Sequence, residues 1–250
     1  MFSFVPPNNL EGLQFYLDKR SSSSLTDFEQ PMPRYYIGAQ LTKPIQVRIP
    51  GPLKLIIAMF HRVRSTRLFR TPMRHFTDQE VGLDELYPTL VRQFDEQFRE
   101  ATAVEDKIRQ IDNLFIAISK QQSCEKSIVD YSVTQIYGAH GNIRVKELVD
   151  QLNTTHKTLE THFKEHLGLT PKQYIDVARV NFVLSQLKKL KSYSAADLIG
   201  KTGYYDESHL IKHFKRLVSF TPKTLHRARD FNEWFDIPSF ESMLLNKAAE

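Results

Sequence analysis

Residues 159–172 read LETHFKEHLGLTPK, and residues 210–223 read LIKHFKRLVSFTPK. The two stretches align without gaps at an offset of 51 residues, and seven of the fourteen positions are identical. Chance gives about one identity over such a length, so the similarity indicates a duplicated structural unit. The second half of the chain is therefore predicted to contain two copies of one helical unit.

A short amphipathic helix is predicted before each copy, over residues 145–152 and 195–202. Thr155 offers an N-cap hydroxyl to the helix that follows in the first copy, while in the second Gly203 suits a positive φ and Asp206 suits an N-cap. Two short helices joined by a tight turn form a helix-turn-helix. In the helix after each turn, the residues predicted to face the core are Leu159, Phe163 and Leu167 in the first copy and Leu210, Phe214 and Leu217 in the second.

Residues 171–190 are predicted to form one helix that connects the two units, because Pro171 suits a first helical turn and apolar residues follow at helical spacing. A helix of about 15 residues spans ~22 Å, which would place the two units near the ~34 Å between successive major-groove faces of DNA. The charge distribution agrees with a polyanionic partner. The chain has a net charge of +5, and residues 122–230 hold 17 Lys and Arg against 11 Asp and Glu.

The first half of the chain differs from the second in its predicted secondary structure. Short β-type runs at residues 35–38, 45–49 and 54–63 are broken by prolines, and helical spacing follows from Asp84 to about Lys120. The predicted fold class is α+β, with a small N-terminal antiparallel β-domain that carries helices and a C-terminal all-α domain with two helix-turn-helix units joined by a connecting helix. The predicted boundaries are 1–121 for a sensing or dimerisation domain, 122–230 for the helix-turn-helix domain and 231–250 for an acidic tail.

The sequence carries no pattern typical of an enzyme. G-x-S-x-G, P-loop and G-x-G-x-x-G motifs are all missing, so we expect no catalytic residues and no cofactor. His156, His162 and His166 match neither the H-E-x-x-H spacing nor a zinc-finger spacing, and no metal site is expected. The chain starts without the features of a signal peptide, and its longest apolar run, residues 53–60, is too short to cross a bilayer. We therefore expect a cytoplasmic protein without membrane contact.

An arginine series in the first half has two interpretations. Its members could line an anion-binding pocket for a small-molecule effector, whose identity the sequence does not indicate. Alternation of charge along a strand is also typical of a solvated face. The candidate effector-binding residues are Arg62, Arg64 and Arg67.

The motifs of the second half resemble those of the AraC/XylS family of transcription regulators. They are T-x-x-x-L-x-x-x-F-x-x-x-x-G-x-T-P over residues 155–171, G-Y-x-D-x-S-H-x-x-x-x-F-K-R over residues 203–216, and the T-P pair at 221–222. The resemblance covers residues 122–229 and implies a seven-helix domain that reads two adjacent major-groove segments. The sequence departs from the family pattern at Thr161, Ile199-Gly200 and Ser219. Residues 69–86 are similar to the N-terminal domain of one subgroup, which implies a role in sensing or dimerisation.

We interpret the chain as a sequence-specific DNA-binding transcription regulator controlled by its N-terminal domain. The expected partners are double-stranded DNA, a second copy of the chain and RNA polymerase. The alternative is a protein-interaction adaptor that keeps the helical scaffold with weakened DNA reading. The residues expected to read bases are His156, Lys157, Thr158, Thr161, His162, Glu207, Ser208, His209 and Lys212. Those expected to contact phosphates are Lys164, Lys172, Arg179, Lys215, Arg216 and Lys223, although Arg179 could instead pair with Asp176 or Glu165.

Overall fold

The computed structural model describes residues 2–5, 7, 12–17, 24–25, 33–38, 40–48, 54–60, 68–69, 71–119 and 127–227. Two antiparallel sheets form the N-terminal part, one of three strands in the order β1-β5-β3 and one of four strands in the order β6-β2-β4-β7. The strands are β1 (Phe2–Val5), β2 (Gly12–Tyr16), β3 (Ser24–Leu25), β4 (Tyr35–Gly38), β5 (Ile45–Arg48), β6 (Leu55–Met59) and β7 (Glu80–Gly82).

The strand predictions are confirmed at β4, β5 and β6, although the end of the predicted run 54–63 lies outside the described residues. β2, one of the two inner strands of the larger sheet, was not predicted. β2 pairs with both β4 and β6, so that Leu13 lies opposite Ile37 on one side and Ala58 on the other. The three segments come together only in the folded sheet, and the sequence of β2 alone is too short to indicate its inner place.

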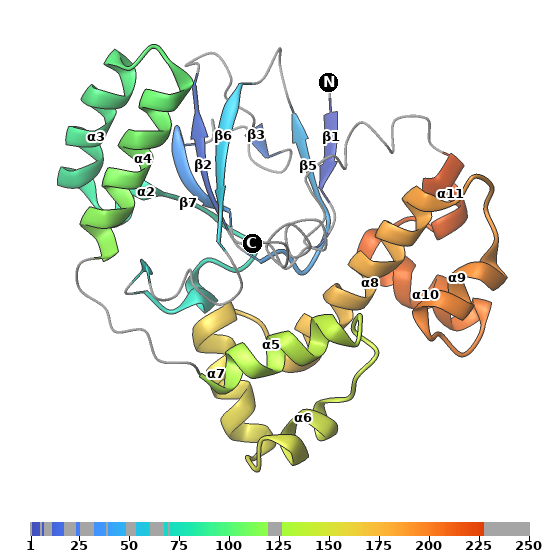
Figure 1. Ribbon diagram of the computed structural model, residues 1–250. Coiled ribbons are helices and arrows are strands. Elements are labelled where there is room, and N and C mark those ends of the chain that lie inside the picture. The colour runs from blue at the N-terminus through green and yellow to red at the C-terminus, as the bar shows by residue number, and fades with distance from the viewer. Residues whose placement is uncertain are drawn as a thin grey trace.

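Three helices cover one face of the four-stranded sheet, on the side away from the smaller sheet (Figure 1). They are α2 (Leu83–Leu86), α3 (Pro88–Glu100) and α4 (Val104–Ser119), which confirms the helical prediction for residues 84–120. Alternation along β2 points Phe15 into this layer, where its ring centroid lies 5.8 Å from that of Phe94 on α3. Aromatic packing of this kind accounts for much of the N-terminal core.

Among the described residues, the C-terminal part contains seven helices, as the family resemblance implied. They are α5 (Ile128–Gly138), α6 (Val145–Gln151), α7 (His156–Leu167), α8 (Pro171–Lys189), α9 (Ala195–Thr202), α10 (Glu207–Val218) and α11 (Pro222–Arg227). α8 is the predicted connecting helix. Its first half packs into a core with α5, α6 and α7, and its second half packs into another core with α9, α10 and α11. One helix thus carries both helix-turn-helix units.

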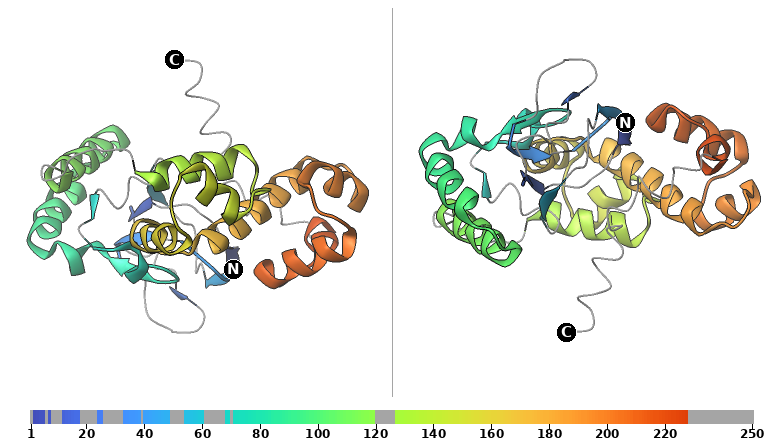
Figure 2. Two further views of the ribbon diagram at one scale, coloured as in Figure 1. Left: turned by 90° about the horizontal axis from the view of Figure 1, so that it is seen from below. Right: turned by 90° about the horizontal axis from the view of Figure 1, so that it is seen from above.

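The two parts of the chain meet at α7. A 3-10 helix, η2 (Met73–His75), contacts α7, and the Thr77 hydroxyl donates a hydrogen bond of 2.9 Å to the carbonyl oxygen of Gly168. In both views of Figure 2, α3 and α4 lie at one end of the molecule and α9 to α11 at the other. No helix among the described residues is long and apolar enough to cross a membrane.

Several predictions concern residues outside the described ranges. The candidate effector-binding residues Arg62, Arg64 and Arg67 are among them, as is the acidic tail 231–250. The boundary predicted near residue 121 also falls in such a segment.

Candidate nucleic-acid interface

The first helix-turn-helix unit consists of α6 and α7. Asn153 in the turn takes a φ of 47°, a left-handed conformation that asparagine tolerates better than most residues. The Thr155 hydroxyl then accepts a hydrogen bond of 3.1 Å from the backbone N–H of Thr158 and so caps α7. The helix ends at Gly168, whose φ is 74°. The N-cap predicted from the sequence is confirmed.

The second unit, α9 and α10, repeats this geometry. Gly203 closes α9 with a φ of 66°, and the Asp206 carboxylate accepts a hydrogen bond of 2.7 Å from the backbone N–H of His209. α10 ends at Ser219, which takes a φ of 67° at the position equivalent to Gly168. A serine is costlier than glycine in this conformation, yet the backbone is the same. The duplication in sequence is therefore also a duplication in structure.

The second helix of each unit, called its recognition helix, is α7 in the first unit and α10 in the second. Each recognition helix buries one stripe of apolar side chains. In α7 this stripe is Leu159, Phe163 and Leu167, as predicted. In α10 the prediction of Leu217 is wrong, because Val218 is fully buried and Leu217 is only partly so. The spacing explains the correction, since Val218 follows Phe214 by four residues and continues the same helical face.

The predicted base-reading positions lie mainly on the solvent side of α7 and α10. One of them, His162, is half-buried beside the apolar stripe of α7. Thr161 donates its hydroxyl hydrogen back to the Lys157 carbonyl oxygen at 3.0 Å. The exposed members of the set are His156, Lys157, Thr158, Thr161, Glu207, Ser208, His209 and Lys212.

The cations predicted to contact phosphates divide into two groups. Lys164 forms an ion pair of 2.7 Å with Glu160 on the same helix. Lys215 and Lys223 are exposed. The other three make contacts inside the domain: Lys172 pairs with Asp176 on α8 itself, whereas Arg179 and Arg216 join α8 to the second unit.

Asp176 is the centre of these internal contacts. Its carboxylate accepts hydrogen bonds from Lys172 at 2.7 Å and Arg216 at 2.9 Å, and lies 3.2 Å from Nε2 of His213. The other ring nitrogen of His213 is 2.5 Å from the Tyr204 hydroxyl. Burial by itself would raise the pKa of Asp176, but the hydrogen bonds from His213 and Lys172 outweigh it and lower the pKa to about 2. Asp176 therefore stays ionised and ties α8 to α10.

Arg179 adds a second link between α8 and the second unit. Its guanidinium donates a hydrogen bond of 2.6 Å to the Gly203 carbonyl oxygen and lies 4.0 Å from the centre of the Tyr204 ring. The internal ion pair considered for Arg179 with Asp176 or Glu165 is thus replaced by contacts with the turn of the second unit. Sequence reasoning missed this network, because Tyr204 and His213 gave no periodic signal of their own.

The departure from the family pattern at Ile199-Gly200 is explained by the surroundings of these two residues. A Cβ atom added at Gly200 would meet no atom within 4 Å, so the glycine does not mark a close approach of two helices. Ile199 packs against the core shared with Leu198 and Leu210. The second unit therefore keeps its packing, with one helix-weakening residue on its exposed side.

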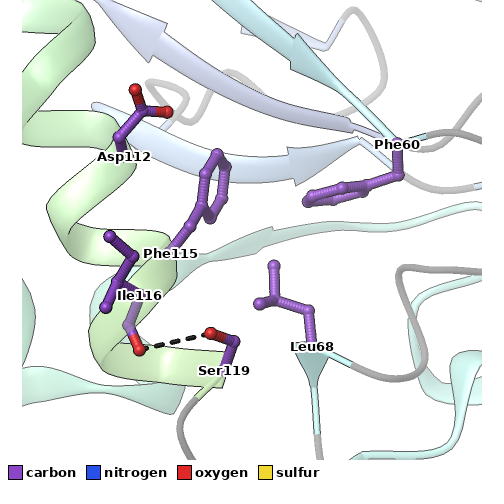
Figure 3. Close-up of a pocket in the computed structure, with 6 residues that line it drawn as sticks. All are labelled: Phe60, Leu68, Asp112, Phe115, Ile116 and Ser119. Carbon is purple, nitrogen blue, oxygen red and sulfur yellow. Dashed lines mark hydrogen bonds between the residues drawn. The ribbon is translucent and has the colours of Figure 1, made fainter. Parts of the chain in front are cut away.

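A pocket opens in the N-terminal part between the end of β6 and α4 (Figure 3). Its volume is about 460 Å³, within the range of small-molecule sites. The rings of Phe60 and Phe115 meet edge to face across it, with centroids 5.7 Å apart. Asp112 is the one ionisable group among the six lining residues, which are Phe60, Leu68, Asp112, Phe115, Ile116 and Ser119.

One group on α7 has the composition of a metal site. Each of the side chains of His162, Glu165 and His166 offers a nitrogen or oxygen atom, and these atoms all lie within 4.8 Å of one another. The spacing rules had predicted no metal site here. The helix brings the three together because they are separated by three and four residues.

Comparison with known proteins agrees with this geometry. Residues 148–228 match the family model of a helix-turn-helix domain. The HTH-type transcriptional activator RhaS of Salmonella arizonae is 25% identical over 83 residues, which cover 33% of this chain and 30% of that protein, and RhaS of Salmonella newport gives the same values. ToxT from Vibrio cholerae has a similar fold, with a TM-score of 0.52 and 11% sequence identity over 90% of this chain and 94% of that chain.

Two capped helix-turn-helix units on one connecting helix, with a matching family model, make residues 148–228 a DNA-binding type of domain. The sequence match spans about a third of the curated relatives, while the fold match extends over the β-domain as well. Over these residues the chain is similar to transcription regulators of the AraC/XylS type.

Proposed function

We propose that this chain is a sequence-specific DNA-binding regulator in which α7 and α10 read two adjacent major-groove segments. The main support is the equivalence of the two units, which share capping and left-handed termination 51 residues apart. They are carried by the 19-residue α8. A helix of this length spans ~28 Å, and the recognition helices packed near its ends come close to the spacing of successive major grooves, ~34 Å.

The surface chemistry of the recognition helices supports the same proposal. Lys157 and Lys212 are exposed in the N-terminal halves of α7 and α10, where side chains can reach base edges. Lys215 and Lys223 are exposed further along and suit phosphate contact. Arg179 and Arg216 act instead as positioning residues, since they hold the second unit on α8, and Lys172 pairs with Asp176 within α8.

Footprinting with the full chain on selected genomic fragments tests the proposal. Two protected segments about 10–10.5 base pairs apart on one face of the duplex are expected. Protection of a single segment, unchanged by Lys212→Ala, would show that α10 does not read DNA.

An adaptor that contacts proteins is the second candidate function. It is favoured by one observation, namely that three of the six predicted phosphate contacts are engaged inside the domain. The two candidates differ in salt dependence. DNA binding by the basic domain should weaken by about 0.9 in log K per unit of log salt for each phosphate neutralised, whereas a flat response favours the adaptor.

We also propose that the N-terminal part controls DNA binding as a homodimer formed through α4. Val104, Ile108 and Ile116 lie on one row of α4 and are 50%, 45% and 53% exposed, and the exposed Asp112 interrupts the row between Ile108 and Ile116. An apolar stripe of this kind is typical of a helix that packs against a second helix. It lies at the end of the molecule away from α10, so a second copy would leave the DNA-reading helices accessible (Figure 2).

A further inference from the structure

We propose that His162, Glu165 and His166 form a binding site for a divalent transition-metal ion of the zinc type on α7. The two histidines are one helical turn apart, and their rings are parallel within 4° with centroids 5.9 Å apart. Glu165 lies between them in sequence and adds a carboxylate, and the three donor atoms are within 4.8 Å of one another. The order H-x-x-E-H is one in which a single helix presents two metal-binding imidazoles.

The distances suit one ion after a small adjustment. Two donors on a tetrahedral zinc ion are about 3.4 Å apart, given bonds of about 2.0–2.1 Å. Glu165 is exposed, so its carboxylate has room to turn toward the two half-buried imidazoles. Three protein ligands leave the fourth position to water. Imidazole with carboxylate favours zinc, nickel or copper over magnesium and calcium, which prefer sets of oxygen ligands.

The second unit supplies an internal comparison. His213 is the duplicate of His162, and both of its ring nitrogens have protein partners, Asp176 and Tyr204. Nδ1 of His162 is buried and has no hydrogen-bond partner among the described residues. An unsatisfied buried nitrogen is costly, and a bound metal ion would order the ring that carries it.

The positions of α10 that are equivalent to Glu165 and His166 also hold residues of a different kind. Where α10 has Arg216 and Leu217, α7 has Glu165 and His166. An arginine and a leucine cannot bind a cation, whereas a glutamate and a histidine both can. The metal-binding set is therefore specific to the first unit, and the second unit fills the equivalent place with the Asp176 network.

The proposed metal site lies next to the contact between α7 and the N-terminal part. His166 is two residues before Gly168, whose carbonyl oxygen accepts the hydrogen bond from Thr77. A bound ion bridges successive turns of α7 immediately before this contact. It stiffens the end of the recognition helix at the place where the N-terminal part touches it.

Zinc titration of the metal-free full chain against a chromogenic chelator tests the site. The wild type should bind one equivalent of Zn²⁺. His162→Ala and His166→Ala should each weaken that binding by more than about 100-fold, because loss of even a hydrogen-bonding neighbour of a metal ligand costs about 10–100-fold. The matched control is His156→Ala, an exposed histidine on the same helix outside the cluster, which should bind as the wild type does.

Circular dichroism and thermal unfolding show whether each variant is folded. Zn²⁺ should raise the Tm of the wild type and of His156→Ala, but not that of His166→Gln, which keeps the helix and removes a ligand. Excess Mg²⁺ should not displace the zinc. Failure of the wild type to retain zinc, or retention unchanged in both His162→Ala and His166→Ala, would overturn the proposal. Either outcome leaves the DNA-binding proposal untouched, because the titration contains no DNA.

Discussion

Gly200 and Gly203 are three residues apart at the end of α9, yet alanine should have opposite effects at the two positions. A methyl group at Gly200 meets no neighbour within 4 Å, so Gly200→Ala should stabilise the domain by about 1 kcal/mol through helix propensity. Gly203 takes a φ of 66°, and its added Cβ would lie 2.7 Å from Nδ2 of Asn142. Gly203→Ala should therefore destabilise by about 1–2 kcal/mol. Urea unfolding of the two variants checks the difference, and equal effects would contradict it.

Asp176 should make the second unit sensitive to acid. Its pKa is lowered from an ordinary value of 3.8 to about 2, so the ionised carboxylate stabilises the fold above about pH 4. This contribution, about 2 kcal/mol, is lost as the pH falls from about 4 towards 2. Asp176→Asn should lower stability at neutral pH and flatten the acid limb of the unfolding curve. Asp150→Asn, an exposed carboxylate of α6, is the control and should change neither.

In the proposed function, sequence specificity depends on α7 and α10. Lys157→Ala and Lys212→Ala should change which DNA sequences bind best, since both residues are exposed in the N-terminal halves of α7 and α10. Lys215→Ala should weaken binding to all sequences by a similar factor, because a phosphate contact carries no base information. Binding to a randomised DNA library distinguishes the two effects. A uniform loss in all three variants would argue against base reading by these lysines.

The connecting helix determines how the two units are oriented. α8 is joined to α10 by Asp176 and to the turn before α10 by Arg179. The first unit has a different external support, the contact of η2 and Thr77 with the end of α7. The two units are therefore alike in backbone and both pack on α8, but the first has an added contact with the N-terminal part and the second has added polar links to α8.

At the scale of the whole molecule, the apolar stripe of α4 predicts the oligomeric state. Ile108→Glu should convert a homodimer into a monomer at micromolar concentration, because it replaces one of the three exposed apolar side chains of α4 with a second charge one turn from Asp112. Gln93→Glu adds the same charge at an exposed position of α3 and serves as the control. Light scattering measures both variants. A wild type that is monomeric with and without DNA would remove the basis of the dimer proposal.

The sequence by itself determined the features that depend on neighbouring residues. The duplication, the caps at Thr155 and Asp206, the connecting helix and the buried stripe of α7 all follow from local chemistry and helical periodicity. The H-x-x-E-H order at residues 162–166 is equally local, and a check for that spacing would have found it.

Only the tertiary structure decided which distant residues meet. β2 takes an inner place in its sheet by pairing with β4 and β6, and the Thr77 hydroxyl reaches Gly168 across 91 positions of the chain. Asp176 and Arg216 are 40 positions apart, and their pairing gives a residue predicted to contact phosphate a partner inside the domain. The physical reason is that a charged side chain looks the same in sequence whether it meets solvent, DNA or an opposite charge. Its partner is selected by the packing of α8 against α10, which no local pattern encodes.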